Sequence, residues 1–212
     1  MNQQLLDILA LAVPILIALT VHEVSHGWVA WKLGDPTAKM MGRLTLNPIA
    51  HLDPIGTLML FLVRFGWAKP VPVDPRYFKN PKQDMLWVAL AGPASNMILA
   101  LLFGMLIRMV GLQSTGSFTM DFLKMMLLYG LYINLALAIF NLLPIPPLDG
   151  GRILRGLLPW RYEHIVDRLE QYGPFVLMGL IFLGMFSGFS VFGIIITPFV
   201  RFFGGLFAGI NL

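Results

Sequence analysis

Three long apolar segments set the first limit on how this chain can fold. They cover residues 5–31, 85–110 and 120–143, and each contains a run close to the roughly 20 residues that a helix needs to cross a bilayer. Charged residues make up only 12% of the sequence, about half the share expected of a soluble domain, while 57% of residues are hydrophobic. The sequence therefore predicts an all-α polytopic membrane protein with about five to six transmembrane helices.

The segments around these runs predict a re-entrant region and a C-terminal pair of helices. Within residues 36–80, the stretch 51–65 has an apolar run of about 11 residues, which is too short to span and is interpreted as re-entrant or interfacial. The preceding stretch KMMGRLTLN alternates like a short strand, so a β-hairpin-like element is expected here. Residues 172–210 are apolar with a break, SGFS, at 187–190. We expect one membrane-embedded domain over 1–212.

Basic residues predict the orientation in the membrane. The connection 32–82 carries Lys32, Lys39, Arg43, Arg64, Lys69, Arg76, Lys79 and Lys82 against three acids, and 152–168 carries four arginines. Because Lys and Arg favour cytoplasmic connections, both are expected on the cytoplasmic side of a prokaryotic cell membrane. This bias also accounts for the net charge of +4, so the lipid bilayer, and no nucleic acid, is the expected partner.

A second basic connection contains a regular acidic pattern. Glu163, Asp167 and Glu170 are spaced like one face of a helix, and we interpret them as a solvated surface.

Arg108 lies near the end of its apolar segment. We interpret it as an anchor whose long side chain reaches the membrane surface by snorkelling.

The first apolar segment contains the pattern His-Glu-x-x-His at 22–26. On a helix, His22 and His26 share one face, so both imidazoles reach one ion and Glu23 lies beside the open position of that ion. This is the geometry of zinc hydrolases. A polar helix-packing contact is the alternative, but an ionisable cluster in a membrane helix is costly and favours a functional site.

A catalytic zinc site usually has a third protein ligand. The chain has no cysteine, and the predicted topology brings Asp149, in NLLPIPPLDGGRI, to the depth of the two histidines. Prolines at 144, 146 and 147 end the preceding helix. Alternatively, Asp149 caps a helix that starts near Gly151. His51 and Asp53 are a weaker candidate pair, because a turn before Pro54 explains them without a metal.

These motifs resemble those of the site-2 proteases, the zinc intramembrane metalloproteases of peptidase family M50. The similarity rests on HEVSH, on LAGPASN at 90–96 and on NLLPIPPLDGG at 141–151. GRLTLNPIAHLDPIGT is similar to the small branch of the family without a PDZ domain. The resemblance implies that His22, His26 and Asp149 bind Zn²⁺ and that Glu23 is the catalytic base.

The resemblance also implies roles for two asparagines. Asn141 would lie near the active site and steady the substrate carbonyl or the oxyanion, and Asn96 would contribute with it to substrate binding. Interhelical hydrogen bonding is the alternative for both amides.

The expected activity is zinc-dependent endopeptidase cleavage of transmembrane protein or peptide substrates, near the cytoplasmic side. A strand at GRLTLN would bind an unwound substrate by edge addition. The alternative from another class is a divalent-cation transporter, but no paired halves with broken helices are visible in the sequence.

Overall fold

The structure is a computed structural model that describes residues 3–63, 66–187 and 190–210. Within these residues the helices are α1 (Gln3–Lys32), α2 (Thr37–Met40), α3 (Pro54–Val63), α4 (Pro81–Val110), α5 (Phe118–Leu142), α6 (Asp149–Leu157), α7 (Glu163–Ser187) and α8 (Val191–Ala208). Short 3-10 turns lie at η1 (Pro48–His51), η2 (Pro75–Tyr77) and η3 (Trp160–Tyr162). The described chain has no strand, and α1, α4, α5, α7 and α8 are long and apolar enough to cross a membrane. This confirms the all-α polytopic fold.

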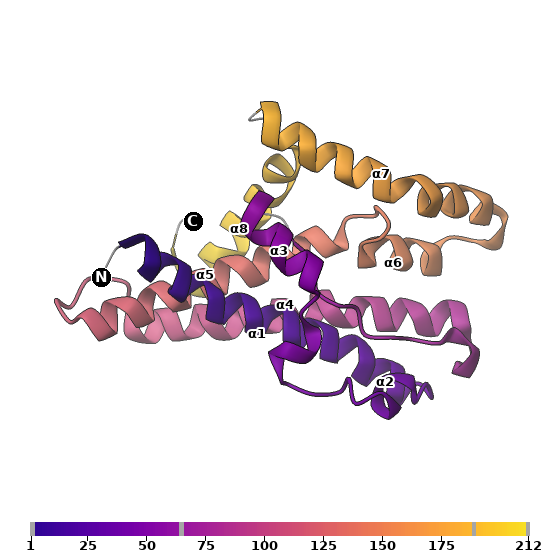
Figure 1. Cartoon of the computed structure of the whole chain (residues 1–212), viewed down its shortest axis with the longest axis horizontal. Coiled ribbons are helices and arrows are strands. Elements are labelled where there is room, and N and C mark those ends of the chain that lie inside the picture. Colours follow the sequence, from indigo (N-terminus) through magenta and orange to yellow (C-terminus); the bar gives the residue numbers. More distant parts are fainter. Residues whose placement is uncertain (1–2, 64–65, 188–189, 211–212) are drawn as a thin grey trace.

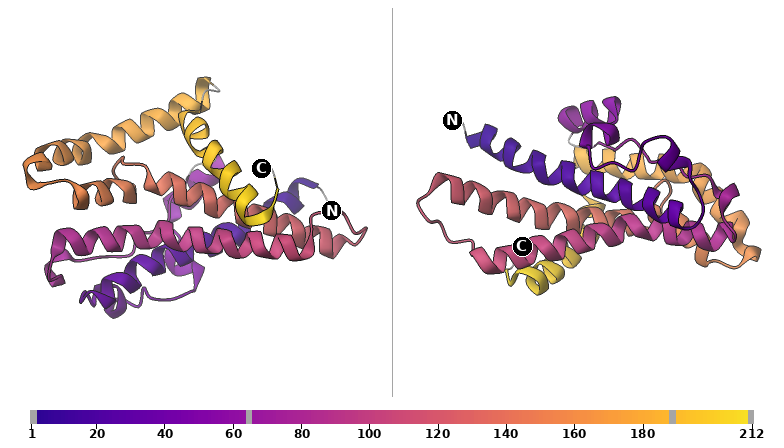
Figure 2. Two further views of the ribbon diagram at one scale, coloured as in Figure 1. Left: turned by 180° about the vertical axis from the view of Figure 1, so that it is seen from behind. Right: turned by 90° about the horizontal axis from the view of Figure 1, so that it is seen from below.

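Three helices form the centre of the protein. The predicted core segments 5–31, 85–110 and 120–143 correspond to α1, α4 and α5, which lie alongside one another in Figure 1. Helix α8 packs across α4 and α5 (Figure 2) and closes a buried apolar cluster of Ala100, Ile107, Leu127, Leu131, Leu135, Val200 and Ala208. Helix α7 contacts chiefly α6 and η3, so it diverges from this centre.

Two helices begin earlier than the hydrophobic pattern predicts. Helix α4 begins at Pro81, because proline suits the first helical position and the Asp84 carboxylate accepts the N–H of Asn80 at 2.9 Å. Helix α7 begins at 163, not 172, because Arg155 of α6 forms ion pairs along its first turns with Glu163, Asp167 and Glu170. The three acids therefore pair with Arg155 of α6, and the prediction that they form a solvated surface is wrong in this respect. Of the predicted break at 187–190, residues 188–189 lie outside the described residues.

The segment around α3, which the sequence predicts to be re-entrant or interfacial, folds back as a hairpin. Helix α3 has 10 residues, about 15 Å at 1.5 Å per residue, or half the hydrocarbon thickness of about 30 Å. The chain returns to the start of α3, since Leu52 and Ala68 form an antiparallel bridge. A Cβ atom on Gly56 would lie 2.2 Å from the carbonyl oxygen of Trp67, so the two arms touch where only glycine fits. The two ends of the hairpin therefore lie side by side.

The short strand predicted within residues 39–47 is not present. These residues form the end of α2, a turn and extended chain. Side chains satisfy the local backbone groups in place of a strand partner: the Asn47 amide oxygen accepts the N–H of Ile49 at 3.1 Å, and the His51 Nε2–H donates to the carbonyl of Thr45 at 2.8 Å. The Asp53 carboxylate accepts the N–H of Gly56 at 2.8 Å and starts α3. His51 and Asp53 thus form turn contacts, as the sequence indicates.

The C-terminal end of α8 is held on α4 by one charge and one small residue. Arg108 donates from Nε to the carbonyl of Phe207 at 2.8 Å and from Nη2 to that of Leu206 at 2.7 Å, so it binds the negative end of the α8 dipole. Arg108 therefore does more than anchor α4 at the membrane surface. At Gly104, a Cβ atom would lie 2.6 Å from the Cβ of Phe207, so the two helices cross in close contact.

We expect Gly104→Ala to destabilise the detergent-solubilised protein by about 1–3 kcal/mol, because the added methyl group forces α8 away from α4. The matched control is Gly179→Ala in α7, where nothing lies within 4 Å of the new Cβ atom, and its stability should be unchanged or slightly higher. Thermal unfolding followed by circular dichroism measures both. Equal melting temperatures for the two variants would contradict the close crossing at Gly104.

Candidate metal centre

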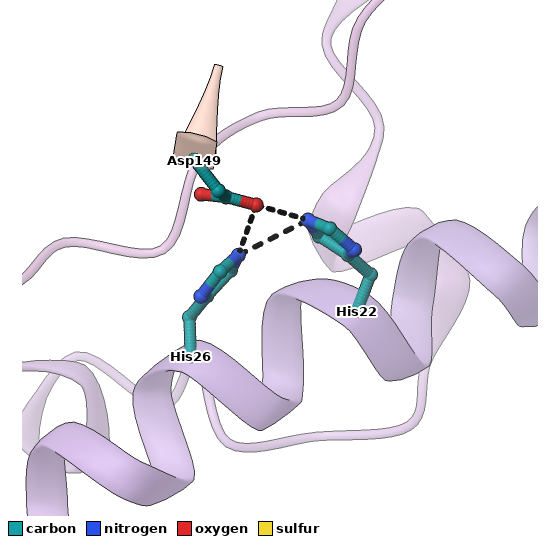
Figure 3. Close-up of side chains that lie close together, drawn as sticks. All are labelled: His22, His26 and Asp149. Carbon is teal, nitrogen blue, oxygen red and sulfur yellow. Dashed lines mark hydrogen bonds and ion pairs between the residues drawn. The ribbon is translucent and has the colours of Figure 1, made fainter. Parts of the chain in front are cut away.

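Three side chains from two distant segments converge at one point inside the protein (Figure 3). His22 and His26 extend from one face of α1, and Asp149 extends toward them from the first turn of α6. The Asp149 Oδ2 atom lies 3.1 Å from the Nε2 of His22 and 3.3 Å from that of His26, and the two Nε2 atoms are 3.0 Å apart. All three residues are buried, with 6–7% of their surface exposed.

The start of α6 is fixed against the end of α5. A Cβ atom on Gly150 would lie 2.1 Å from the carbonyl oxygen of Leu143, so only glycine allows α6 to begin this close to α5. Leu148 occupies the N-cap position, and Asp149 is the first helical residue. The capping alternative for Asp149 is therefore not observed, and its carboxylate faces the histidines.

A chain of buried amides orients His22. Asn134 of α5 donates from Nδ2 to the carbonyl of Gly130 at 2.8 Å, which directs its oxygen toward Asn96 of α4. Asn96 donates from Nδ2 to Asn134 Oδ1 at 2.9 Å and to the carbonyl of Ala18 at 3.2 Å. Its own oxygen therefore faces His22, whose Nδ1–H donates to it at 2.6 Å. The backbone carbonyls of Gly130 and Ala18, which can only accept, fix the direction of every hydrogen bond, and with it the tautomer of His22.

His26 is oriented by the backbone of α4. Its Nδ1 lies 2.7 Å from the carbonyl oxygen of Val88 and must carry the hydrogen, since a carbonyl only accepts. In the neutral imidazoles of His22 and His26, both Nε2 atoms then present lone pairs to each other. Asp149 Oδ2, which has no hydrogen-bond donor, faces both of them. Three electron pairs at 3.0–3.3 Å repel one another unless a proton or a metal ion lies between them.

The donor set fits zinc. Zn²⁺ binds imidazole nitrogen and carboxylate oxygen at about 2.0–2.2 Å, which in a tetrahedron separates the donors by about 3.3–3.6 Å, close to the 3.0–3.3 Å found here. The space at the centre depends on Gly92 of α4, because a Cβ atom there would lie 2.4 Å from the Nε2 of His26 and 2.5 Å from the Cε1 of His22. The site thus offers one divalent ion two neutral imidazoles, one carboxylate and the space that Gly92 leaves open.

Glu23 lies beside the cluster without joining it. It follows His22 on α1, is half-buried, and its Oε2 accepts the backbone N–H of Val71 at 2.8 Å. The carboxylate is therefore held by the chain that follows the hairpin around α3.

The two asparagines predicted from the sequence lie in different surroundings. Asn96 is fully buried and bonded to His22, which favours a role in orienting that ligand over direct contact with substrate. Asn141 is half-buried in the last turn of α5, and its Nδ2 donates to the carbonyl of Leu137 at 3.0 Å. Among the described contacts, none joins Asn141 to the three donors. Asn134 is not among the residues predicted from the sequence, where its only distinguishing feature is an amide in an apolar helix.

Comparisons with known proteins agree on one family. The family model of peptidase family M50 matches residues 10–187. "Putative zinc metalloprotease YwhC" of Bacillus subtilis (strain 168) is 43% identical over 173 residues, which cover 80% of this chain and 78% of that protein. "Zinc metalloprotease MJ0392" of Methanocaldococcus jannaschii is 25% identical over 189 residues, 88% of this chain but only 45% of that protein. No solved structure matches the chain.

We expect Asn134→Leu to weaken zinc binding about 10- to 100-fold, because Asn96 loses the partner that directs its oxygen to His22. Competition with a chelating dye measures the affinity in detergent. Asn141→Leu is the matched control on the same helix, and it should bind zinc as the wild type does. A wild-type affinity for Asn134→Leu would show that the amide chain does not support the metal centre.

Proposed function

Because this chain belongs to peptidase family M50, we propose that the cluster of His22, His26 and Asp149 holds its catalytic zinc ion and serves peptide hydrolysis inside the membrane. The family makes the protein a zinc metalloprotease, and the five apolar helices found among its described residues make it an integral membrane protein. Beyond this, we propose which residues bind the zinc ion, which residue is the general base, at what depth in the membrane cleavage occurs and what kind of substrate is cut.

The observation that carries the proposal is the position of the cluster along α1. At 1.5 Å per residue, His26 and His22 lie about 9 and 15 Å from Lys32, the last residue of that helix. We therefore propose that the site lies within the hydrocarbon layer, nearer to the end of α1 that leads into the basic connection. By the positive-inside rule this end faces the cytoplasm, so we place cleavage of transmembrane segments near the cytoplasmic side of the cell membrane.

The residues of the chain have separate tasks in this mechanism. Held by His22, His26 and Asp149, a zinc ion would lower the pKa of a bound water to about 7 and would polarise the substrate carbonyl. The Nδ1 hydrogen bonds of His22 and His26 leave the Nε2 lone pairs available to bind the ion, and Asp149 supplies one negative charge. Glu23 accepts a proton from the attacking water and later delivers it to the leaving amine nitrogen.

Two further features support a site that admits water and an extended substrate. A pocket of about 270 Å³ lies between the loop before α6 and α7, and its lining includes Arg152, Glu170 and Leu148, the residue that precedes Asp149. We assign water entry to this pocket. Asn141, which now donates to Leu137, is proposed to turn its amide toward the carbonyl of an unwound substrate.

We expect Glu23→Gln to lower cleavage about 10²- to 10⁴-fold while leaving bound zinc unchanged, because the amide cannot accept the water proton. The assay uses labelled transmembrane peptides with the purified protein in detergent, and zinc is quantified in both proteins by atomic emission. Mass spectrometry of the products locates the cut bond, expected in the cytoplasmic half of the peptide.

Other results would contradict the proposal in identifiable ways. Equal cleavage by both proteins would remove Glu23 as the base. Cleavage by neither, over a broad panel, would argue against a peptidase acting on such segments. Uptake of zinc by proteoliposomes containing the inactive protein would favour a transporter instead.

A further inference from the structure

A short extended segment crosses α1 beside the helical turn that carries His22, Glu23 and His26. Residues 69–74, KPVPVD, follow the hairpin around α3, and we call them the strap. Val71, at the middle of the strap, is buried with 7% of its surface exposed. A Cβ atom on Gly27 would lie 2.8 Å from the Cγ1 of Val71, so the strap touches α1 one residue beyond His26.

The strap is tied to the protein at both of its ends. Lys69 donates its N–H to the carbonyl of His51 at 2.8 Å, and its own carbonyl accepts from Arg43 Nη2 at 2.8 Å. At the other end, the N–H of Asp74 donates to Asp35 Oδ2 at 2.7 Å. Asp35 is fully buried, and its second oxygen accepts from Thr37, so this anchor is itself fixed. Anchors at both ends hold the middle of the strap at one distance from α1.

The middle of the strap offers α1 a single hydrogen-bond donor. Residues 70 and 72 are prolines, which have no N–H and restrict the backbone to extended conformations. Between them, the N–H of Val71 donates to Glu23 Oε2 at 2.8 Å. A hydrogen bond to one carboxylate oxygen restricts the rotation of the glutamate side chain and leaves the other oxygen to accept a proton.

We propose that Val71 is a positioning residue, whose backbone N–H holds the Glu23 carboxylate in the orientation in which it serves as general base. The inference rests on the proposed function, since it assigns Glu23 its task. A positioning contact and an inhibitory contact at Glu23 have opposite effects on the rate of catalysis. A positioning bond raises the rate of the chemical step, whereas a bond that occupies the base must be released before catalysis.

The direct test replaces the Val71 amide by an ester, using the α-hydroxy acid analogue of valine in cell-free synthesis with nonsense suppression. The ester removes the N–H and keeps the side chain. We expect kcat for a cleavable transmembrane peptide to fall about 10- to 100-fold, with KM and bound zinc unchanged, because a hydrogen bond to a charged group is lost in the catalytic step.

Two controls separate the N–H from the rest of the strap. An ester at Val73 alters the same segment and leaves the bond to Glu23 in place, so kcat should stay near the wild-type value. Val73→Ala shortens a side chain of the strap and retains every N–H, and it should keep most of the wild-type kcat.

The outcomes distinguish this inference from the proposed function. An unchanged or higher kcat for the Val71 ester, with an active wild type, overturns the positioning role and leaves the peptidase proposal intact. Loss of zinc from the ester protein overturns it also, because the strap would then support the metal centre itself. A wild type that cuts no peptide overturns the proposed function, and this inference with it.

Discussion

The repulsion among three lone pairs is the constraint on which the interior of this protein depends. His22, His26 and Asp149 can face one another at 3.0–3.3 Å only with a positive ion between them, and only if hydrogen bonds elsewhere keep the imidazole rings in place. Water does not supply those bonds inside a bilayer, so the protein must. Asn96 and the carbonyl of Val88 do so from α4, and the packing of α1 on α4 is therefore also the support of the metal centre.

The same constraint explains where the chain uses glycine. Gly92 leaves the centre open, Gly150 lets α6 begin against α5, and Gly27 allows the strap to lie on α1. In each place a single methyl group would meet a metal donor, a carbonyl or a buried valine. The chain around the site thus depends on backbone contacts at least as much as on the donors themselves.

The sequence predicts those features of the fold and the site that depend on local helix geometry. It does not predict features that depend on residues far away in the chain. The spacing of His22 and His26 follows from the helical repeat, and the depth of Asp149 follows from counting spans, so the structure brings the predicted donors together. The predicted strand failed because Asn47 and His51 satisfy the backbone locally, which alternation of apolar residues does not reveal. The early start of α7 depends on Arg155 of another helix.

Contacts across the chain were the least predictable part of the site. Asn134 reads as one more amide in an apolar helix until Asn96 is placed beside it, and the bond between Glu23 and Val71 joins residues 48 positions apart. Hydrophobic pattern and secondary-structure propensity describe a residue within its own segment. The bonds of Asn134 to Asn96 and of Val71 to Glu23 form only after several segments have packed, so neither can be predicted from one segment alone.

The division of the metal donors between α1 and α6 has a consequence for the synthesis of the protein. Two of the donors leave the ribosome with the first helix, but the third follows only after α4 and α5 have been made. A growing chain therefore holds no complete centre while its first helices enter the membrane. The three donors can meet only after α6 has been made, when α1, α4 and α5 have already left the ribosome and α7 and α8 have not.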